Sequence, residues 1–267
     1  MATPRLTRDD MIVRLGEIAR EGWTPSLRPL NSGGIGNTID ARLGIAENNL
    51  AIADTAQWEI KSHRVGSASL LTLFHTEPEP RAARVVPQLL LPMYGWPHQR
   101  PRVPGELSFR QTLRATQLTD RGFGLEIDAD GAQVRVNFDA ESVDTRHRNW
   151  LQSVERRVGL GPLDPQPYWP IQTLFLTAQT KMLNTFYVEA YTRRQRGEEF
   201  FAIERVTVLQ GFELDRFANA LRQGNAQVDF DARTTHNHGT KFRIRQNIVP
   251  QLYRYAEIAI GPFQRPG

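Results

Sequence analysis

Residues 54–64 of the chain read DTAQWEIKSHR, and this stretch determines how the rest of the sequence is interpreted. If residues 58–64 form a β-strand, their side chains alternate, so Glu59 and Lys61 point to the same face with about 6–7 Å between their Cα atoms. Asp54 lies on the approach to that strand and can turn its carboxylate toward Glu59. The stretch therefore predicts two carboxylates and one amine close together at the end of a strand.

Two neighbouring carboxylates repel each other unless a cation lies between them. Hard oxygen ligands of this kind suit Mg²⁺, which keeps several waters and takes further ligands from phosphate. A lysine alongside can orient the attacking water and stabilise the charge that grows on phosphorus. Asp40, in the stretch GNTIDARLG, is a candidate accessory acid. A solvated Glu–Lys pair at a sheet edge has the same pattern, so the residues alone leave both interpretations open.

The composition is that of an ordinary globular protein and excludes several other classes. The chain has 267 residues, of which 40% are hydrophobic and 23% charged, enough for one large domain or two lobes. There is no cysteine, which excludes disulfides and thiolate metal sites. No apolar run approaches the roughly 18 residues of a membrane span, and the start of the chain is too polar for a signal peptide. We therefore expect a soluble, cytoplasmic protein with no membrane partner.

Positive charge is in slight excess and is carried almost entirely by arginine. Lysine and arginine number 33 against 29 aspartates and glutamates, for a net charge of +4. Lysine occurs only at positions 61, 181 and 241. A GC-rich coding sequence explains this bias, and the need for phosphate and guanine contacts is compatible with it. In such a chain, each lysine is a candidate for a specific role.

The pattern of apolar residues and turns indicates a mixed α/β or α+β fold. Helices are expected at 8–21, with Thr7 as N-cap, near 35–43, at 141–159, at 213–224 and after Pro250. Strands are expected at 58–64, 67–76, 122–128, 132–138, 171–192 and 199–209, and on both sides of a His-rich loop near 236. Seven prolines between 78 and 104 indicate an irregular connection with at most one short helix.

The block from residue 30 to residue 64, LNSGGIGNTIDARLGIAENNLAIADTAQWEIKSHR, resembles the N-terminal part of the MvaI/BcnI family of restriction endonucleases. The resemblance continues through SLLTLFHTEP at 69–78 and returns near the C-terminus as DFDART and HNHGTKFRI. It spans most of the chain and is weak between about 80 and 200. Ala53 precedes Asp54 where the wider superfamily often has proline, a loose feature that puts little in doubt.

The resemblance implies a PD-(D/E)xK nuclease core, shared with the mismatch-repair nicking enzyme MutH, with a mixed central sheet flanked by helices. It implies that Asp54 and Glu59 bind the metal ion, Mg²⁺ or Mn²⁺ as its substitute, and that Lys61 is the catalytic lysine. It also implies a monomer with two lobes around a DNA cleft, and adds the expectation of a prokaryotic source. We expect the catalytic lobe at about 1–105 and the remaining sheet and recognition lobe at 106–267.

The segment from 226 to 246 carries side chains of the kinds that can read C·G base pairs, and its resemblance to the family's recognition segment implies this role. Guanine O6 and N7 require donors, chiefly arginine, and cytosine N4 requires acceptors such as aspartate. Asp229, Asp231 and Arg233 share one face of a strand, and Lys241, Arg243 and Arg245 share a face of the next, so the two strands form a ribbon that fits a major groove. Without the resemblance, a charged solvent-exposed face is the better interpretation.

Three histidines complete the predicted DNA-binding set. His236 and His238 could ligate a metal ion. Because the sequence offers no third ligand beside them, contact with DNA bases is the better interpretation. The family uses a histidine near position 75 to contact the middle base pair of the site, so the resemblance gives His75 this role. Its imidazole offers one donor and one acceptor.

Together these features predict a type II restriction endonuclease that cuts double-stranded DNA at a short CC(S/W/N)GG-like site by sequential nicking. A DNA methyltransferase in the same system would protect the host's own sites. Two alternatives stay open: a MutH-like repair endonuclease that only nicks, and a DNA-binding module without turnover.

Overall fold

A computed structural model describes residues 6–29, 33–45, 58–128 and 130–262. The chain is a mixed arrangement of helices and sheets, as the sequence predicts. It forms two compact units built from interleaved segments: unit 1 contains residues 1–71, 177–213 and 249–267, and unit 2 contains 72–176 and 214–248. This division differs from the consecutive one expected at residue 105.

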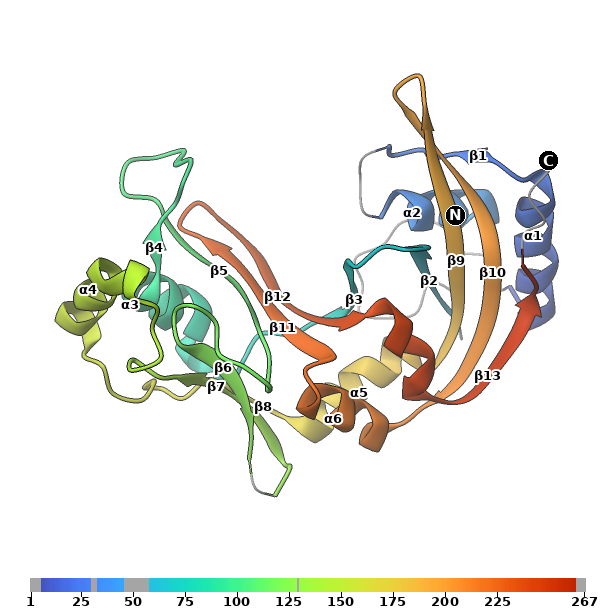
Figure 1. The fold of residues 1–267 in the computed structure, drawn as a ribbon. Helices are drawn as coiled ribbons and strands as arrows, with labels where there is room; N and C mark the ends of the chain where they lie inside the picture. The colour runs from blue at the N-terminus through green and yellow to red at the C-terminus, as the bar shows by residue number, and fades with distance from the viewer. Residues whose placement is uncertain (1–5, 30–32, 46–57, 129, 263–267) are drawn as a thin grey trace. The chain divides into compact units, whose positions relative to one another are not determined.

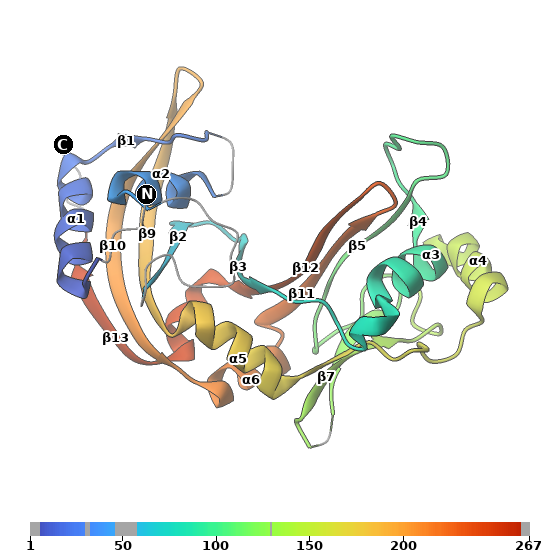
Figure 2. The same cartoon turned by 180° about the vertical axis from the view of Figure 1, so that it is seen from behind.

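Unit 1 is built on a mixed five-stranded sheet with a long, curved β9–β10 hairpin (Figures 1 and 2). The strand order is β1-β10-β9-β2, with β13 also paired to β10. β2 is parallel to β9, and the other pairs are antiparallel. The elements are α1 (Arg8–Glu21), β1 (Thr24–Pro25), α2 (Gly34–Leu43), β2 (Glu59–Arg64), β9 (Asn184–Gln195), β10 (Glu198–Phe212) and β13 (Tyr253–Ile260).

Helix α1 begins where the sequence predicts. The Thr7 hydroxyl accepts a hydrogen bond from the backbone N–H of Asp10 at 3.2 Å, and the Asp10 carboxylate accepts one from the backbone N–H of Thr7 at 3.0 Å. This capping box satisfies two N–H groups that the helix leaves free. The buried side of α1 packs with Ile35 and Ile39 of α2 against Ile60 of β2 and the apolar residues of β9 and β10. These residues are the core of unit 1.

Unit 2 contains two sheets. The larger has the order β3-β12-β11-β5-β4, and the smaller has the order β6-β7-β8. Their strands are β3 (Leu70–His75), β4 (Trp96–Pro97), β5 (Leu107–Leu113), β6 (Phe123–Ile127), β7 (Gln133–Phe138), β8 (Tyr168–Pro170), β11 (Ala226–Arg233) and β12 (His236–Arg245). The helices are η1 (Arg81–Ala83), η2 (Val86–Leu90), α3 (Leu91–Tyr94), η3 (Thr145–His147), α4 (Arg148–Val158) and α6 (Leu214–Arg222). The unit boundaries fall within β3, within α5 (Ile171–Met182) and within η4 (Gln246–Leu252).

Aromatic side chains form the core of unit 2. Phe109 of β5 contacts Phe123 of β6 edge-to-face, with 5.2 Å between ring centroids. Phe242 of β12 lies between Phe74 at 5.0 Å and Trp169 at 5.3 Å. Because residues alternate along a strand, burying Phe242 on this side leaves Lys241 and Arg243 on the other side of β12.

Two predicted elements are wrong. Residues 171–182 form helix α5, not a strand, because Ile171, Leu174, Ala178 and Met182 recur at helical spacing and are buried together. Residues 253–260 form strand β13, not a helix, because their aromatic and β-branched side chains pair with β10. The helix predicted at 141–159 is shorter and begins at Arg148. Helical turns at 86–94 are the main regular structure of the proline-rich connection.

Candidate functional site

Strand β2 carries the first group of candidate site residues. Glu59, Lys61 and His63 alternate with the core residue Ile60, so they share the face opposite α1 and α2. Glu59 is 3% exposed. The Lys61 Nζ donates a hydrogen bond to Glu59 Oε1 at 2.5 Å. The acid and the amine that the sequence places on one face are therefore in direct contact.

The second oxygen of this carboxylate has no hydrogen-bond partner among the residues that the structure describes. Glu59 Oε2 is buried and accepts no hydrogen bond from the described residues. A buried carboxylate oxygen without a donor costs free energy, so such an atom calls for an explanation such as a bound ion. The geometry therefore leaves one hard oxygen ligand available on the inner face of β2.

Of the two aspartates in the predicted cluster, the structure describes only Asp40. Asp54 lies outside the described residues. Asp40 lies on α2, and its Oδ1 atom is buried. Because Gly36 of the same helix approaches the Ser62 hydroxyl, α2 packs on the side of β2 opposite to Glu59 and Lys61. The role of Asp40 as an accessory acid stays a prediction.

Residues of β9 and β13 surround the Glu59–Lys61 pair. In the parallel register, Glu59 pairs with Thr185 and Lys61 with Tyr187. The Thr185 hydroxyl lies 2.8 Å from the Tyr253 hydroxyl, and both residues are fully buried. Burial raises the pKa of Tyr253, and the charge of Glu59 raises it further, so this hydroxyl keeps its proton. Glu59 therefore lies in a closed, polar environment.

His63 lies on the same face, two residues beyond Lys61. Its ring stacks on Tyr187 with 5.0 Å between centroids, and its Nδ1 atom is buried without a hydrogen-bond partner in the described residues. Burial lowers the pKa of His63, because the charged imidazolium is disfavoured away from water. This histidine is therefore neutral at pH 7.

Sequence reasoning missed Thr185, Tyr187 and Tyr253. A usable signal is present in the alternation of Thr185, Tyr187 and Glu189 with the apolar Phe186 and Val188. This alternation is hidden when residues 171–192 are predicted as one continuous strand, because the helical residues 171–182 do not follow it. Tyr253 fell in the segment assigned to a helix.

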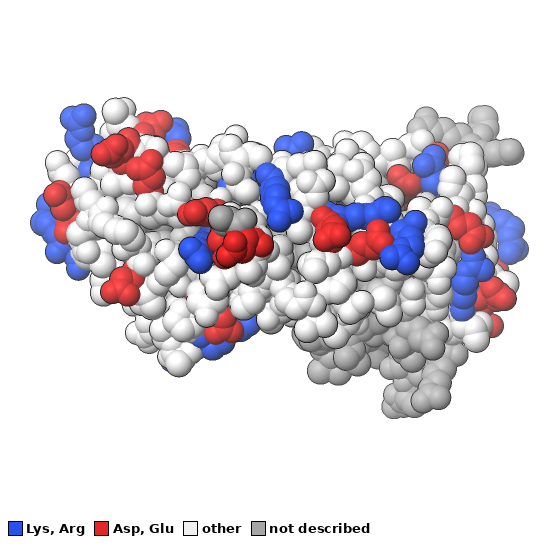
Figure 3. All heavy atoms as spheres, turned by 90° about the horizontal axis from the view of Figure 1, so that it is seen from below, with Lys and Arg blue, Asp and Glu red and all other residues white. Residues whose placement is uncertain are grey.

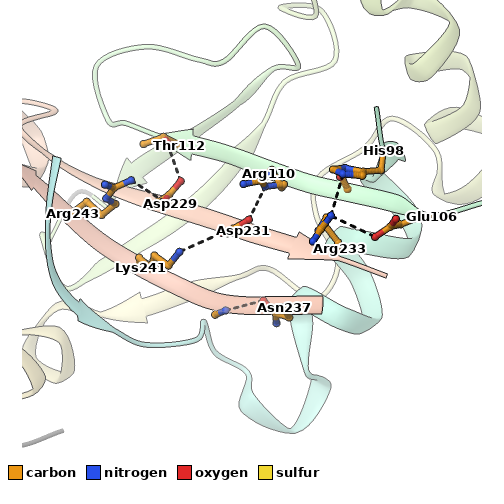
Figure 4. A network of polar contacts seen from close by, with 12 residues as sticks. His98, Glu106, Arg110, Thr112, Asp229, Asp231, Arg233, Asn237, Lys241 and Arg243 are labelled. Atoms are coloured by element: carbon orange, nitrogen blue, oxygen red, sulfur yellow. Dashed lines mark hydrogen bonds and ion pairs between the residues drawn. The ribbon is translucent and has the colours of Figure 1, made fainter. Parts of the chain in front are cut away.

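The second group of candidate residues lies on one face of the larger sheet of unit 2 (Figure 4). Asp229 is opposite Lys241 of β12 and Thr112 of β5, and Asp231 is opposite Arg110. Their neighbours Val228, Phe230 and Phe242 are buried on the other side. We call this polar side of β5, β11 and β12 the reading face; it consists of Arg110, Thr112, Asp229, Asp231, Arg233, Lys241 and Arg243.

Both aspartates of the reading face have partners on the two neighbouring strands (Figure 4). Asp229 accepts hydrogen bonds from Thr112 at 3.0 Å and from Arg243 at 3.2 Å. Asp231 accepts them from Arg110 at 2.6 Å and from Lys241 at 3.3 Å. Burial acts to raise the pKa of Asp231, but Arg110 and Lys241 outweigh it and lower the pKa. The carboxylate is therefore charged at neutral pH, and the face presents ordered acceptors and donors.

Arg233 is turned into a third network at the end of β11. Its Nη1 atom lies 3.1 Å from His98 Nε2 and 3.9 Å from the buried Glu106 carboxylate. Thr235 also donates to Glu106, at 2.6 Å. Its hydrogen bonds with Thr235 and the Arg102 backbone N–H lower the pKa of Glu106. Sequence reasoning missed His98 and Glu106, which belong to the proline-rich connection.

The predicted histidines lie near the β11–β12 hairpin. His236 and His238 are exposed and meet edge-to-face with 4.0 Å between ring centroids. His75 is exposed at the end of β3, and a Cβ placed on Gly239 would lie 3.8 Å from its ring. Arg245 is exposed at the far end of β12. The structure therefore places His75 beside the β11–β12 hairpin that carries His236 and His238.

Charge is not segregated over the visible surface. On the face in Figure 3, basic side chains lie among acidic ones and do not form one continuous basic area. Within the described residues, no group of three or more His, Cys, Asp or Glu side chains is placed to hold a metal ion. None of the described helices has both the length and the apolar character that crossing a membrane requires.

Comparison with known proteins gives the class and the family. The family model for MvaI/BcnI restriction endonucleases matches residues 12–253. A solved structure of restriction endonuclease MvaI with its cognate DNA substrate is similar, with TM-score 0.75, 20% identity, and coverage of 96% of this chain and 100% of that chain. MvaI in the absence of DNA matches with TM-score 0.52, 20% identity, and coverage of 94% and 98%. No curated protein sequence matches the chain.

These matches define the protein as a site-specific deoxyribonuclease with the fold of MvaI. The chain belongs to the MvaI/BcnI restriction endonuclease family. The resemblance inferred from its sequence is confirmed.

Proposed function

We propose that the chain is a type II restriction endonuclease that uses a divalent cation, Mg²⁺ with Mn²⁺ as its substitute, to hydrolyse double-stranded DNA at a CC(S/W/N)GG-like site. The observation that carries the proposal is the state of Glu59. One oxygen of this buried carboxylate is held by Lys61, and the other has no partner in the described part of the chain. Family membership and the similarity to MvaI bound to DNA support the same conclusion.

The donor atoms on β2 fit a hard divalent cation. Glu59 Oε2 would hold the ion together with Asp54, whose spacing from Glu59 in the sequence favours convergence, and Asp40 is the candidate accessory acid. When bound, such a cation polarises the scissile phosphate and lowers the pKa of a coordinated water. Oxygen ligands and retained waters favour Mg²⁺ over softer metals.

Lys61 would act on the reacting phosphate. Its ammonium group is anchored by Glu59 Oε1 and is 16% exposed, so it can also donate to an incoming oxygen. In hydrolysis, a water oxygen forms a new bond to phosphorus and that water gives up a proton to solvent. The bond from phosphorus to the leaving sugar oxygen breaks, and the leaving oxygen takes up a proton from solvent. The ammonium stabilises the negative charge that develops on the phosphate oxygens.

The reading face would recognise C·G pairs. Asp229 and Asp231 can accept from cytosine N4, and Lys241, Arg243, Arg233 and Arg245 can donate to guanine O6 and N7. Each aspartate already holds two donors on neighbouring strands, so its oxygens are fixed in direction before DNA arrives. Each of these oxygens can accept a further hydrogen bond, so a base that offers no donor in that direction leaves this accepting capacity of a partly buried carboxylate unused, which is the source of discrimination.

The histidines at the hairpin would extend this readout. His75 would contact the middle base pair, since a neutral imidazole presents one donor and one acceptor and suits either orientation of a C·G pair. His236 and His238, exposed on the same hairpin, would contact neighbouring base edges or phosphates.

The proposal assigns cleavage to unit 1 and base reading to unit 2. With one catalytic strand per chain, a monomer would cut the two DNA strands in sequence, with a nicked intermediate. A methyltransferase of the same restriction system would protect host DNA in the bacterial cytoplasm.

The test is cleavage of supercoiled plasmid carrying CCSGG and CCWGG sites, with Mg²⁺ and with EDTA. The wild-type protein should give defined linear fragments through a nicked form only with Mg²⁺. Lys61→Ala should lower the rate by about 10²–10³-fold, because it removes a donor to the developing charge. Lys181→Ala is the matched control, a lysine on α5, and should cut normally.

Two outcomes would replace the proposal. Nicks that are never converted to linear DNA indicate a MutH-like strand-nicking repair enzyme. Plasmid that is bound but stays intact with Mg²⁺ and with Mn²⁺ indicates a DNA-binding module without turnover.

A further inference from the structure

A second polar site of unit 2 lies at the β4–β5 edge of the reading face. It is an open pocket of about 570 Å³. Its lining includes three arginines and two histidines but one carboxylate, that of Asp120. An excess of fixed donors in a hollow of this kind is typical of a site for an anion.

An arginine stacked on aromatic rings forms one wall of the pocket. The Arg121 guanidinium lies 4.1 Å from the ring centre of Trp96 and 5.5 Å from that of Trp150. Its side chain is 17% exposed, and its Nε atom has no hydrogen-bond partner in the described residues. Burial lowers the pKa of Arg121, which still stays charged because an arginine is not deprotonated in proteins. The wall therefore carries a fixed positive charge.

The single carboxylate is shared among several donors. Asp120 Oδ2 lies 2.8 Å from Arg146 Nη2 and 2.8 Å from His147 Nε2, and Asp120 Oδ1 lies 3.6 Å from Arg121. Arg146 Nε also lies 3.6 Å from Asp144 Oδ2, a carboxylate outside the lining. Within the lining itself, Arg110, Arg121 and Arg146 face only Asp120, which leaves a net positive charge even when His147 is neutral. Arg146 is 62% exposed at its side chain, so it can turn from Asp120 to a ligand at little cost.

The pocket and the reading face share Arg110 of β5, and a contact between Arg233 and His98 also joins them. Arg110 lines the pocket and also donates to Asp231 of the reading face. His98 lines the pocket and accepts from Arg233, because a guanidinium can only donate; its Nδ1–H therefore donates to Ser108 at 2.6 Å. Figure 4 shows His98 and Arg110 on the β5 side of the network. The two sites are thus continuous.

The separation of the two sites matches the dimensions of DNA. Neighbouring strands lie about 4.8 Å apart, so the β4–β5 edge is roughly 7–12 Å from the middle of the β11–β12 pair. A major groove is about 12 Å wide, which places its phosphate walls about 6 Å from its centre and beyond. If β11 and β12 read base edges along the groove, the pocket at the sheet edge faces the sugar–phosphate wall.

We propose that this pocket binds a backbone phosphate on the wall of the groove that the reading face enters, with Arg146 and Arg121 as its charged donors. The inference rests on the proposed function, since it requires that the reading face engages duplex DNA. The contact carries no sequence information: it sets the register of β11 and β12 on the base pairs.

The test compares Arg146→Gln with Arg156→Gln, an exposed arginine of α4 outside the pocket. Binding of a duplex that carries the cleaved site is measured in EDTA between 50 and 200 mM salt. Loss of one phosphate contact should reduce the slope of the logarithm of the binding constant against log salt by about 0.9. The ratio of the wild-type affinity to the Arg146→Gln affinity should therefore change about threefold across this range. Arg146→Lys should keep the slope, and Arg156→Gln should match the wild type.

Duplexes with a single neutral methylphosphonate identify the phosphate. At one or two positions beside the site, neutralising the phosphate should weaken DNA binding by the wild type and leave DNA binding by Arg146→Gln unchanged. The ratio of affinities for cognate and altered duplexes should stay the same in Arg146→Gln, because a phosphate contact does not read bases. Inorganic phosphate replacing chloride at equal ionic strength should not compete.

Three results overturn the inference. Equal salt slopes for Arg146→Gln, Arg156→Gln and the wild type exclude a phosphate contact at this pocket. Stabilisation of the protein by inorganic phosphate that is lost in Arg146→Gln, together with DNA binding that is the same in Arg146→Gln and the wild type, assigns the pocket to the free anion instead of DNA. A methylphosphonate effect that persists in Arg146→Gln places the contact elsewhere. If the wild-type protein shows no preference for any duplex, the proposed function itself fails, which is a separate result.

Discussion

The contact between Glu59 and Lys61 can be tested by its contribution to the free energy of unfolding, independently of catalysis. Lys61→Ala removes the lysine from the Glu59 carboxylate, in a residue that is 3% exposed, and so leaves the negative charge uncompensated. Glu59→Gln removes that negative charge instead. Lys61 also has other contacts, so each single variant measures more than this pair. A double-mutant cycle with Glu59→Gln/Lys61→Ala isolates the interaction.

The structure sets the expected size of the coupling. Removing one partner of a buried ion pair costs about 3–5 kcal/mol, because the remaining charge is left without compensation. Lys61 is 16% exposed and keeps some access to water, so the coupling energy should be lower, about 2–3 kcal/mol. The double variant should therefore be more stable than Lys61→Ala alone.

The assay is urea unfolding of the four proteins in EDTA, so that no cation replaces the lysine. Lys181→Ala is the control and should change the free energy of unfolding by less than about 0.5 kcal/mol. If the two single effects add to within about 0.5 kcal/mol, the carboxylate and the ammonium do not interact in solution. The account of Glu59 as an acid held ready by Lys61 would then be wrong.

Two further predictions concern the reading face and the buried histidine. Asp231→Asn should remove about 1–3 kcal/mol of discrimination at one C·G pair, measured by competition between duplexes that differ at single positions, whereas Asp215→Asn on α6 should leave discrimination unchanged. Because the folded-state pKa of Asp231 lies below 3.8, its stabilisation is present above pH 3.8 and is lost as the pH falls further, so Asp231→Asn should show a smaller loss of stability below that pH. Burial lowers the pKa of His63 from 6.5, so the stability of the wild type should fall as the pH drops below about 6.5. His63→Gln should flatten this fall, whereas His238→Gln, at an exposed histidine, should not. Equal pH profiles for all three proteins would contradict the burial of His63.

Local signals in the sequence predicted those elements whose ends and faces depend on neighbouring residues. Thr7 and Asp10 form the capping box of α1, and the strands expected at 122–128 and 132–138 pair as β6 and β7, with Gly131 between them at a φ of +66°. The helix ending before Gly224 is also confirmed. In each case a side chain or a backbone conformation specific to the residue type determines the structure over a few positions.

Elements that depend on distant partners were predicted less well. Residues 253–260 become a strand because β10 offers them an edge, and nothing within the segment identifies that partner. The interleaving of the two units has the same origin, since 177–213 and 249–267 join the sheet of β2 through long-range pairing. Tertiary context overrides local preference at such places.

The candidate site follows the same rule. The contact between Glu59 and Lys61 was predictable because both lie on one strand two residues apart. The partners Thr185 and Tyr253, and on the other unit His98 and Glu106, come from segments more than a hundred residues away from the residues that they support. Only the folded chain brings them together.

The alternation of segments between the two units has a consequence for how such an enzyme is made. The chain passes from one unit to the other four times, so neither unit corresponds to a single stretch of gene. If unit 2 reads the bases as proposed, exchanging base preference between relatives would require two separate grafts, 72–176 and 214–248, with the segments of unit 1 left in place around them. During synthesis, Tyr253, whose hydroxyl lies 2.8 Å from that of Thr185, leaves the ribosome after the whole of the larger sheet of unit 2, so unit 1 is completed last.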